Sequence, residues 1–145
     1  AEQAIPLLPL EEVLARADIV SLHVPLLPQT HHLINRDTLA LLRPHAILIN
    51  SSRGGVIDEK ALLEALERKQ LYRAVLDVRE VEPPPLDDPL RHCASVILTP
   101  HIAGLTAEAQ ERTAHLLIND VLSVLAGGRA IGQVSLDEAM QLADQ

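Results

Sequence analysis

Length, composition and charge exclude several classes of protein. The chain has 145 residues, a formal charge of −8 and 1% aromatic residues. It lacks the basic patches and stacking platforms with which proteins bind nucleic acids, and its charge opposes binding to an anionic membrane. Cys93 is the single cysteine, so no intrachain disulfide is expected, which is typical of the cytoplasm. No apolar run approaches the ~20 residues of a membrane span, and the first residues do not resemble a signal peptide. We expect a cytoplasmic protein with no nucleic-acid and no membrane partner.

The apolar residues are almost all branched aliphatics, and they occur in short runs. Hydrophobic residues make up 48% of the chain, without any Phe or Trp. Such runs are typical of strands in a buried parallel sheet. The first residue is Ala1 rather than Met. This indicates part of a longer polypeptide, and trimming of the start is the alternative explanation.

Strand-like and helix-like segments alternate along the chain. In chain order we expect a helix at 10–17, a strand at 18–24, a helix at 36–42, a strand at 45–50, a helix at 58–70, a strand at 73–78, a rigid proline-rich loop at 82–89, a strand at 95–99 and a helix at 106–126. This rhythm predicts βαβ units with right-handed crossovers, and therefore an α/β domain with about four parallel strands and flanking helices.

Helix boundaries are marked by capping residues. Asp58 can cap the helix at 58–70, and Thr106 can cap the helix at 106–126. Gly127 and Gly128 are expected to end the latter, whose apolar stripe comprises Ala114, Leu117, Ile118, Val121 and Leu125. In the tail, Ser135 and Glu138 form a capping box that predicts a short final helix.

Polar residues follow the predicted strands at the edge where an open parallel sheet binds its ligands. The first strand leads into His23-Val24-Pro25, and the second leads into a Ser-Ser-Arg-Gly-Gly turn that contains Arg53. The third leads to Asp77, Glu80 and Glu82, and the fourth to the Pro-His-x-x-Gly turn that contains His101. One edge of the sheet therefore collects groups that can hold an anion and move a proton.

Four segments, LHVPLLPQT, INSSRGGVIDEKAL, LDVREVEPPP and ILTPHIAG, occur in an order and spacing that resemble the signature blocks of the D-isomer-specific 2-hydroxyacid dehydrogenases. This family includes phosphoglycerate dehydrogenases, glyoxylate/hydroxypyruvate reductases and D-lactate dehydrogenases. The resemblance implies the second half of a Rossmann-like, doubly wound NAD-binding domain over residues 1–128, followed by a tail at 129–145. It also implies a homodimeric parent enzyme that transfers a hydride between NAD and a small 2-oxo acid or D-2-hydroxy acid. NADP is left open.

The resemblance also implies roles for individual residues. Arg53 matches the arginine that grips the carboxylate and carbonyl of the 2-oxo acid, and a guanidinium fork suits this task better than lysine. His101 matches the general acid, and Glu82 matches the carboxylate that hydrogen-bonds the histidine and favours its protonated form. Glu80 is the alternative to Glu82, which is preferred because the family glutamate directly precedes a proline.

Further positions match residues that line the cofactor, partly through their backbone. Asp77 matches the acidic residue near the nicotinamide amide. The other expected cofactor contacts are Val24, Ser51, Ser52, Arg53, His101, Ala103 and Gly104.

Simpler roles compete with each of these. Arg53 can pair with a surface carboxylate, His101 can be a turn residue, and Asp77 can be a structural cap. His31 and His32 are an adjacent pair without further ligands at metal spacing, so we expect no metal site.

The sequence departs from the family in two respects. Arg79 stands where an aromatic side chain is usual, and Tyr72 and Arg73 replace small residues, which bears on substrate preference. No G-x-G-x-x-G motif is present in these 145 residues, nor is a substrate-binding domain, so we expect this chain alone to be inactive. Two other functions compete with an oxidoreductase: a corepressor of the same fold that senses NAD(H), and an inactive structural remnant.

Overall fold

The computed structural model describes residues 6–131. Contacts within the chain divide it into two compact units, one comprising residues 1–101 and the other residues 102–145. The predicted short helix of the tail lies outside the described residues. The boundary that we expect at residues 128–129 stays a prediction.

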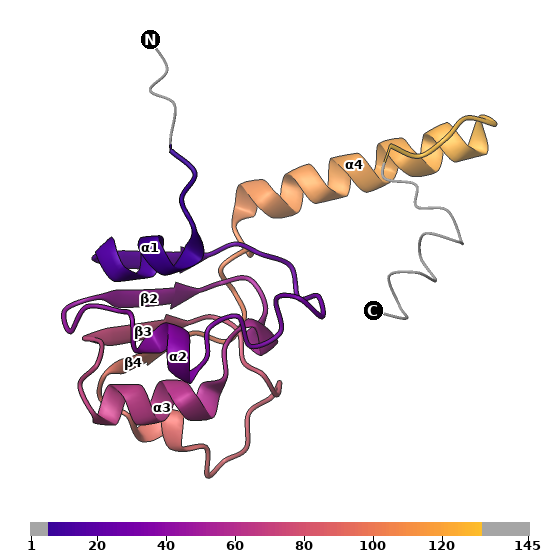
Figure 1. Ribbon diagram of the computed structural model, residues 1–145. Coiled ribbons are helices and arrows are strands. Elements are labelled where there is room, and N and C mark those ends of the chain that lie inside the picture. Colours follow the sequence, from indigo (N-terminus) through magenta and orange to yellow (C-terminus); the bar gives the residue numbers. More distant parts are fainter. Residues whose placement is uncertain (1–5, 132–145) are drawn as a thin grey trace. The chain divides into compact units, whose positions relative to one another are not determined.

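The first unit contains a sheet of four parallel strands in the order β1-β2-β3-β4 (Figure 1). The strands are β1 (Ile19–Leu22), β2 (Ile47–Asn50), β3 (Arg73–Leu76) and β4 (Val96–Leu98). The helices are α1 (Leu10–Arg16), α2 (Arg36–Leu39) and α3 (Glu59–Glu67), with short 3-10 turns at η1 (Gly54–Val56) and η2 (Pro89–His92). Each strand and each of these α-helices lies within a predicted segment, and the α/β class with four parallel strands is confirmed.

Burial alternates along the strands, which shows that one face of the sheet carries the core. Val20, Leu22, Leu48, Ala74 and Leu76 are buried, whereas their neighbours along each strand are half-buried or exposed. The helices contribute to the same core through residues that include Leu14, Leu39, Leu62, Ala65 and Leu66. The strands follow one another across the sheet in chain order. When the crossovers between such strands are right-handed, the connecting helices lie on one face of the sheet. On that face α2 and α3 lie side by side (Figure 1).

Local capping explains where α3 starts. The Asp58 side chain accepts a hydrogen bond from the Ala61 backbone at 2.9 Å, as predicted.

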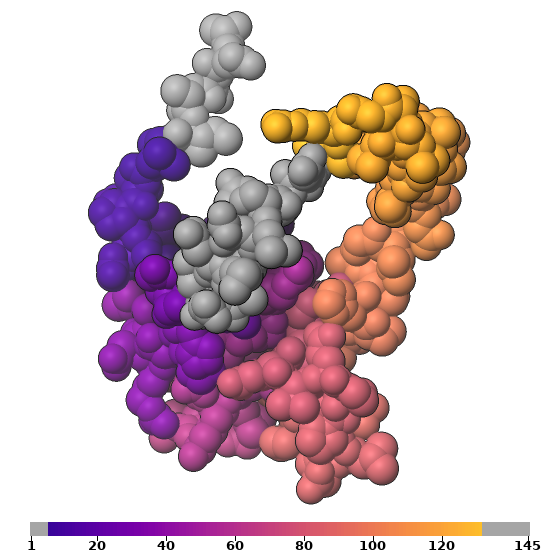
Figure 2. Space-filling view, turned by 90° about the vertical axis from the view of Figure 1, so that its right-hand side faces the viewer, coloured from indigo at the N-terminus to yellow at the C-terminus, as the bar shows by residue number. Residues whose placement is uncertain are grey.

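The packed helices and strands make the first unit one continuous body in the space-filling view (Figure 2).

The second unit contains one long helix, α4 (Ala107–Leu125), within the described residues. Thr106 caps it by accepting from the Ala109 backbone at 3.1 Å, and Gly127 follows it with a φ of 81°. Both features were predicted. None of its residues is buried, and the predicted stripe includes Leu117 at 60% and Leu125 at 79% exposure. None of the helices within residues 6–131 combines the length and apolar character that a membrane crossing requires.

Candidate active site

The register of the sheet brings the predicted site residues to one edge. Leu22, Asn50, Leu76 and Leu98, which end the four strands, lie in line across the sheet. Arg53, Asp77 and His101 lie within three residues of these strand ends. The parallel arrangement therefore gathers them at the carboxyl edge, as the sequence predicted.

His101 is held at this edge by its backbone. Its N–H donates to the Asp77 carbonyl at 2.8 Å and to the Thr99 carbonyl at 3.1 Å. Its φ is 55°, in the left-handed region that non-glycine residues seldom adopt. The hydrogen bond to Asp77, the residue that follows β3, stabilises this unusual backbone and fixes the direction in which the imidazole leaves it.

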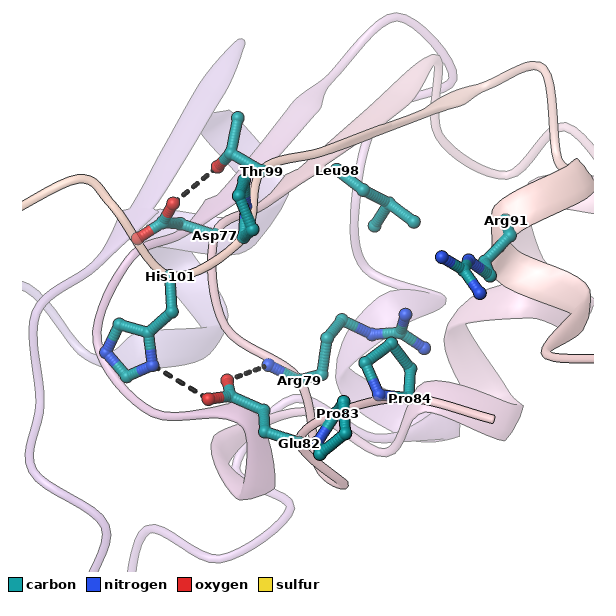
Figure 3. A pocket seen from close by; sticks show the side chains of 10 residues that line it. Asp77, Arg79, Glu82, Pro83, Pro84, Arg91, Leu98, Thr99 and His101 are labelled. Carbon is teal, nitrogen blue, oxygen red and sulfur yellow. Dashed lines mark hydrogen bonds and ion pairs between the residues drawn. The ribbon is translucent and has the colours of Figure 1, made fainter. Parts of the chain in front are cut away.

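The imidazole is paired with Glu82 and not with Glu80. Nδ1 of His101 lies 2.8 Å from Oε2 of Glu82, and the ring points at this carboxylate (Figure 3). A carboxylate only accepts hydrogen bonds, so Nδ1 is the donor and Nε2 is the ring atom from which a proton can pass to a ligand. The side chains are 53% and 37% exposed, respectively, which leaves the pair accessible.

Glu82 is kept ionised by its neighbours. The hydrogen bond from His101 lowers the pKa of the Glu82 carboxyl, and the Arg79 backbone N–H, which donates to Oε1 at 2.8 Å, lowers it further. Both carboxylate oxygens are therefore engaged, and the carboxylate has a fixed orientation.

Arg79 holds the loop that carries Glu82 through a buried ion cluster. Its Nε and Nη2 donate to the two carboxylate oxygens of Glu59 at 2.9 Å each, and its Nη1 donates to Asp88 at 2.6 Å. Burial lowers the pKa of the Arg79 guanidinium, but the hydrogen bonds with Glu59 and Asp88 outweigh burial and raise it overall. The same contact with Arg79 lowers the pKa of Asp88. Glu59 lies at the start of α3, so the cluster ties the loop to the core of the unit.

Asn50 shapes the turn that carries Arg53, and the sequence analysis missed this residue. Asn50 is 1% exposed, accepts from the Ser52 backbone and hydroxyl, and donates to the Arg53 carbonyl at 3.0 Å. Its signal in the sequence is a single amide at the end of an apolar run. The Arg53 side chain is exposed and donates to the Ser52 carbonyl at 2.8 Å.

Gly54 allows the Arg53 turn to approach the loop of Glu82. A Cβ atom at Gly54 would lie 1.9 Å from the carbonyl carbon and oxygen of Arg79. Only glycine fits so close to another backbone. The turns after β2 and β3 therefore pack directly on each other, which places Arg53 beside the segment that positions Glu82.

The predicted cofactor positions lie in both units. Asp77 is 6% exposed and accepts from the Thr99 hydroxyl at 2.5 Å, while Val24 packs against the core after β1. Ser51 is exposed and Ser52 is half-buried. Ala103 and Gly104 belong to the second unit.

A cavity opens beside the histidine–glutamate pair. Its volume is about 640 Å³, within the range of small-molecule sites. In Figure 3, Glu82 and His101 lie on one side of the cavity and Arg91 on the other. The full lining comprises Asp77, Arg79, Glu82, Pro83, Pro84, Arg91, Leu98, Thr99, Pro100 and His101. His101 and Glu82 thus line a space large enough for a small ligand.

Comparison with known protein families identifies the family of this chain. The family described as "D-isomer specific 2-hydroxyacid dehydrogenase, NAD binding domain" matches residues 1–103. The chain belongs to this family, and the resemblance seen in its sequence is confirmed.

Individual relatives cover most of the chain. It is 43% identical over 132 residues to a D-3-phosphoglycerate dehydrogenase of Methanocaldococcus jannaschii, with 91% of this chain and 25% of the relative covered. It is 45% identical over 118 residues to a glyoxylate reductase of Thermofilum pendens, with 81% of this chain and 35% of the relative covered. The solved structure of the TT0316 protein from Thermus thermophilus has a TM-score of 0.86 at 41% identity, with 93% of this chain and 43% of that chain covered. The chain therefore spans less than half the length of these proteins.

Proposed function

We propose that the protein carrying this chain transfers a hydride between a nicotinamide cofactor and a small 2-oxo acid, which becomes the D-2-hydroxy acid. The observation that carries this proposal is the hydrogen bond between His101 Nδ1 and Glu82 Oε2 at 2.8 Å, beside a cavity at the carboxyl edge of a parallel sheet. In a member of this family, such a pair is suited to giving one proton to a substrate oxygen.

The residues at this edge fit the nicotinamide end of the cofactor. Asp77 lines the cavity with a carboxylate, which suits the N–H groups of a carboxamide. We propose Val24, Ser51, Ser52, Ala103 and Gly104 as further contacts. The bound cofactor supplies the hydride, and we propose NAD for this role, with NADP as the alternative.

The chain's own residues then manage the substrate and its proton. The guanidinium of Arg53 binds the carboxylate and the carbonyl oxygen of the 2-oxo acid, which orients the carbonyl carbon for attack. As the hydride reaches that carbon, the carbonyl π electrons move to oxygen, and the proton on His101 Nε2 passes to it. His101 becomes neutral while Glu82 stays ionised. Oxidation of the hydroxy acid follows the same path in reverse, with neutral His101 as the base.

A panel of 2-oxo acids assayed with NADH and NADPH tests this function in the complete protein. We expect reduction of at least one 2-oxo acid to its D-2-hydroxy acid, and a loss of about 10²–10⁴ in rate for His101→Asn. Cofactor binding without turnover of any acid would contradict the proposal and would favour a sensor of NAD(H).

We further propose that residues 1–145 alone bind NAD(H) weakly and are inactive. A pyrophosphate is usually held by a glycine-rich turn at a helix N-terminus, and no G-x-G-x-x-G motif occurs in this sequence. Calorimetric titration that showed micromolar binding to this chain would contradict this. We also propose that the complete protein is a cytoplasmic homodimer, as the family resemblance and the single cysteine suggest.

A further inference from the structure

Two adjacent histidines and a distant glutamate place three metal-ligating atoms together. His31, His32 and Glu80 each offer one such atom, and all three atoms lie within 4.8 Å of one another. His32 Nε2 and Glu80 Oε1 are 3.0 Å apart, although the residues are 48 positions apart in sequence. Ligands bound tetrahedrally to zinc at 2.0–2.1 Å are about 3.3 Å from each other, so this pair already has nearly the required separation. We propose that His31, His32 and Glu80 form a binding site for a divalent transition-metal ion.

The backbones of the three residues are fixed before any ion binds. The N–H of His32 donates to the Gly55 carbonyl at 2.8 Å, and its carbonyl accepts from the Asn35 side chain at 3.1 Å. The N–H of His31 donates to the Leu27 carbonyl at 2.9 Å. Only side-chain rotations are needed to bring the three ligands to one ion, which limits the entropy lost on binding.

Glu80 is anchored through its backbone, and the two imidazole rings lie against each other. The N–H of Glu80 donates to Oε1 of Glu59 at 2.8 Å, the same carboxylate that binds Arg79. The rings of His31 and His32 are stacked, with centroids 3.9 Å apart and an interplanar angle of 26°, so at least one ring must turn before both nitrogens face one ion. The buried ion cluster of Arg79 therefore anchors one ligand, and the loop after β1 presents the other two as a unit.

The ligand set selects the class of ion. Two imidazole nitrogens and one carboxylate suit Zn²⁺, Ni²⁺, Co²⁺ or Cu²⁺, whereas Mg²⁺ and Ca²⁺ prefer ligands that are all oxygen. The side chains of His32 and Glu80 are 33% and 38% exposed, so solvent water can complete the coordination. The ion would join the loop after β1 to the loop that carries Glu82, two residues beyond Glu80.

Calorimetric titration of the complete protein with Zn²⁺ tests the site. We expect one binding event that His31→Gln, His32→Gln and Glu80→Gln each weaken. Loss of an outer-shell partner alone weakens metal binding about 10–100-fold, so loss of a direct ligand should weaken it by at least about tenfold. Co²⁺ should give a visible absorption band that the same variants abolish, and thermal unfolding without metal shows that each variant is folded.

Matched controls separate this site from other histidine–carboxylate pairs. His45 lies 2.8 Å from Asp18, and His115 lies 3.9 Å from Glu111, each as a pair at the surface. His45→Gln and His115→Gln should leave the Zn²⁺ affinity unchanged. Unchanged affinity in His31→Gln and Glu80→Gln, or heat no larger than that of buffer, would overturn the proposal. Binding that is lost in His101→Asn but kept in Glu80→Gln would also overturn it, because the ion would then occupy the catalytic pair.

Discussion

Arg79→Met tests whether the buried ion cluster holds the loop of Glu82 in place. The side chains of Arg79 and Asp88 are each 7% exposed and that of Glu59 is 18% exposed, so water would screen the remaining charges poorly. Removing one partner of a buried ion pair costs about 3–5 kcal/mol, because it leaves an uncompensated buried charge. We expect Arg79→Met to lower the free energy of unfolding by about this amount near pH 7.

Urea unfolding at two pH values distinguishes this mechanism from simple loss of packing. The contact with Arg79 lowers the pKa of Asp88, so its stabilisation is fully present above the ordinary pKa of aspartate and is lost as pH falls through the lowered value. In Arg79→Met the unpaired carboxylates destabilise the fold only while they are ionised. The deficit of the variant should therefore shrink as the pH falls toward about 4.

A triple variant supplies the control. This variant combines Arg79→Met with Glu59→Gln and Asp88→Asn. The amides remove the unpaired charges and keep the oxygen atoms that accept from the Glu80 and Leu90 backbones. The triple variant should regain most of the lost stability. A loss below about 1 kcal/mol for Arg79→Met near pH 7, as for a surface pair, would refute the reasoning. An equal loss of stability near pH 7 and near pH 4 would also refute it.

Three further predictions concern the site. Glu82→Gln should lower kcat/KM for reduction, because a neutral amide makes a weaker hydrogen bond to Nδ1 of His101 than the carboxylate does. Asp87→Asn in the same loop should leave kcat/KM unchanged, and wild-type kcat/KM in Glu82→Gln would show that Glu82 does not support His101. Arg53→Lys should lower kcat/KM for 2-oxo acids and leave cofactor affinity nearly intact, and wild-type kcat/KM on every acid would contradict its role. Gly54→Ala should destabilise by at least the ~1–3 kcal/mol of overpacking in a thermal-unfolding assay, because a Cβ would meet the Arg79 backbone at 1.9 Å. Gly104→Ala should leave the stability unchanged, because nothing lies within 4 Å of a Cβ at this position. Equal stability of the two variants would argue against close packing of the loops.

Local patterns in the sequence were enough to predict the elements of the fold. Apolar runs predicted the four strands, and Asp58 and Thr106 predicted the starts of α3 and α4, because capping and strand formation depend on neighbouring residues. The alternation of these elements predicted a parallel sheet, whose strand ends share one edge. Arg53, Asp77 and His101 could therefore be assigned to the same edge from the order of residues alone.

Contacts between loops were decided only by the tertiary structure. The sequence showed that Arg79 is unusual at its position, but not that Glu59 and Asp88 surround it. It showed two adjacent histidines, but not that Glu80 meets His32. These partners lie 9 to 48 residues apart, and irregular loops have no periodicity from which their approach can be predicted. The proline after Glu82 was enough to prefer it over Glu80 as the partner of His101, and the structure has this pair. Only the path of the loop shows that Glu80 meets His32 instead.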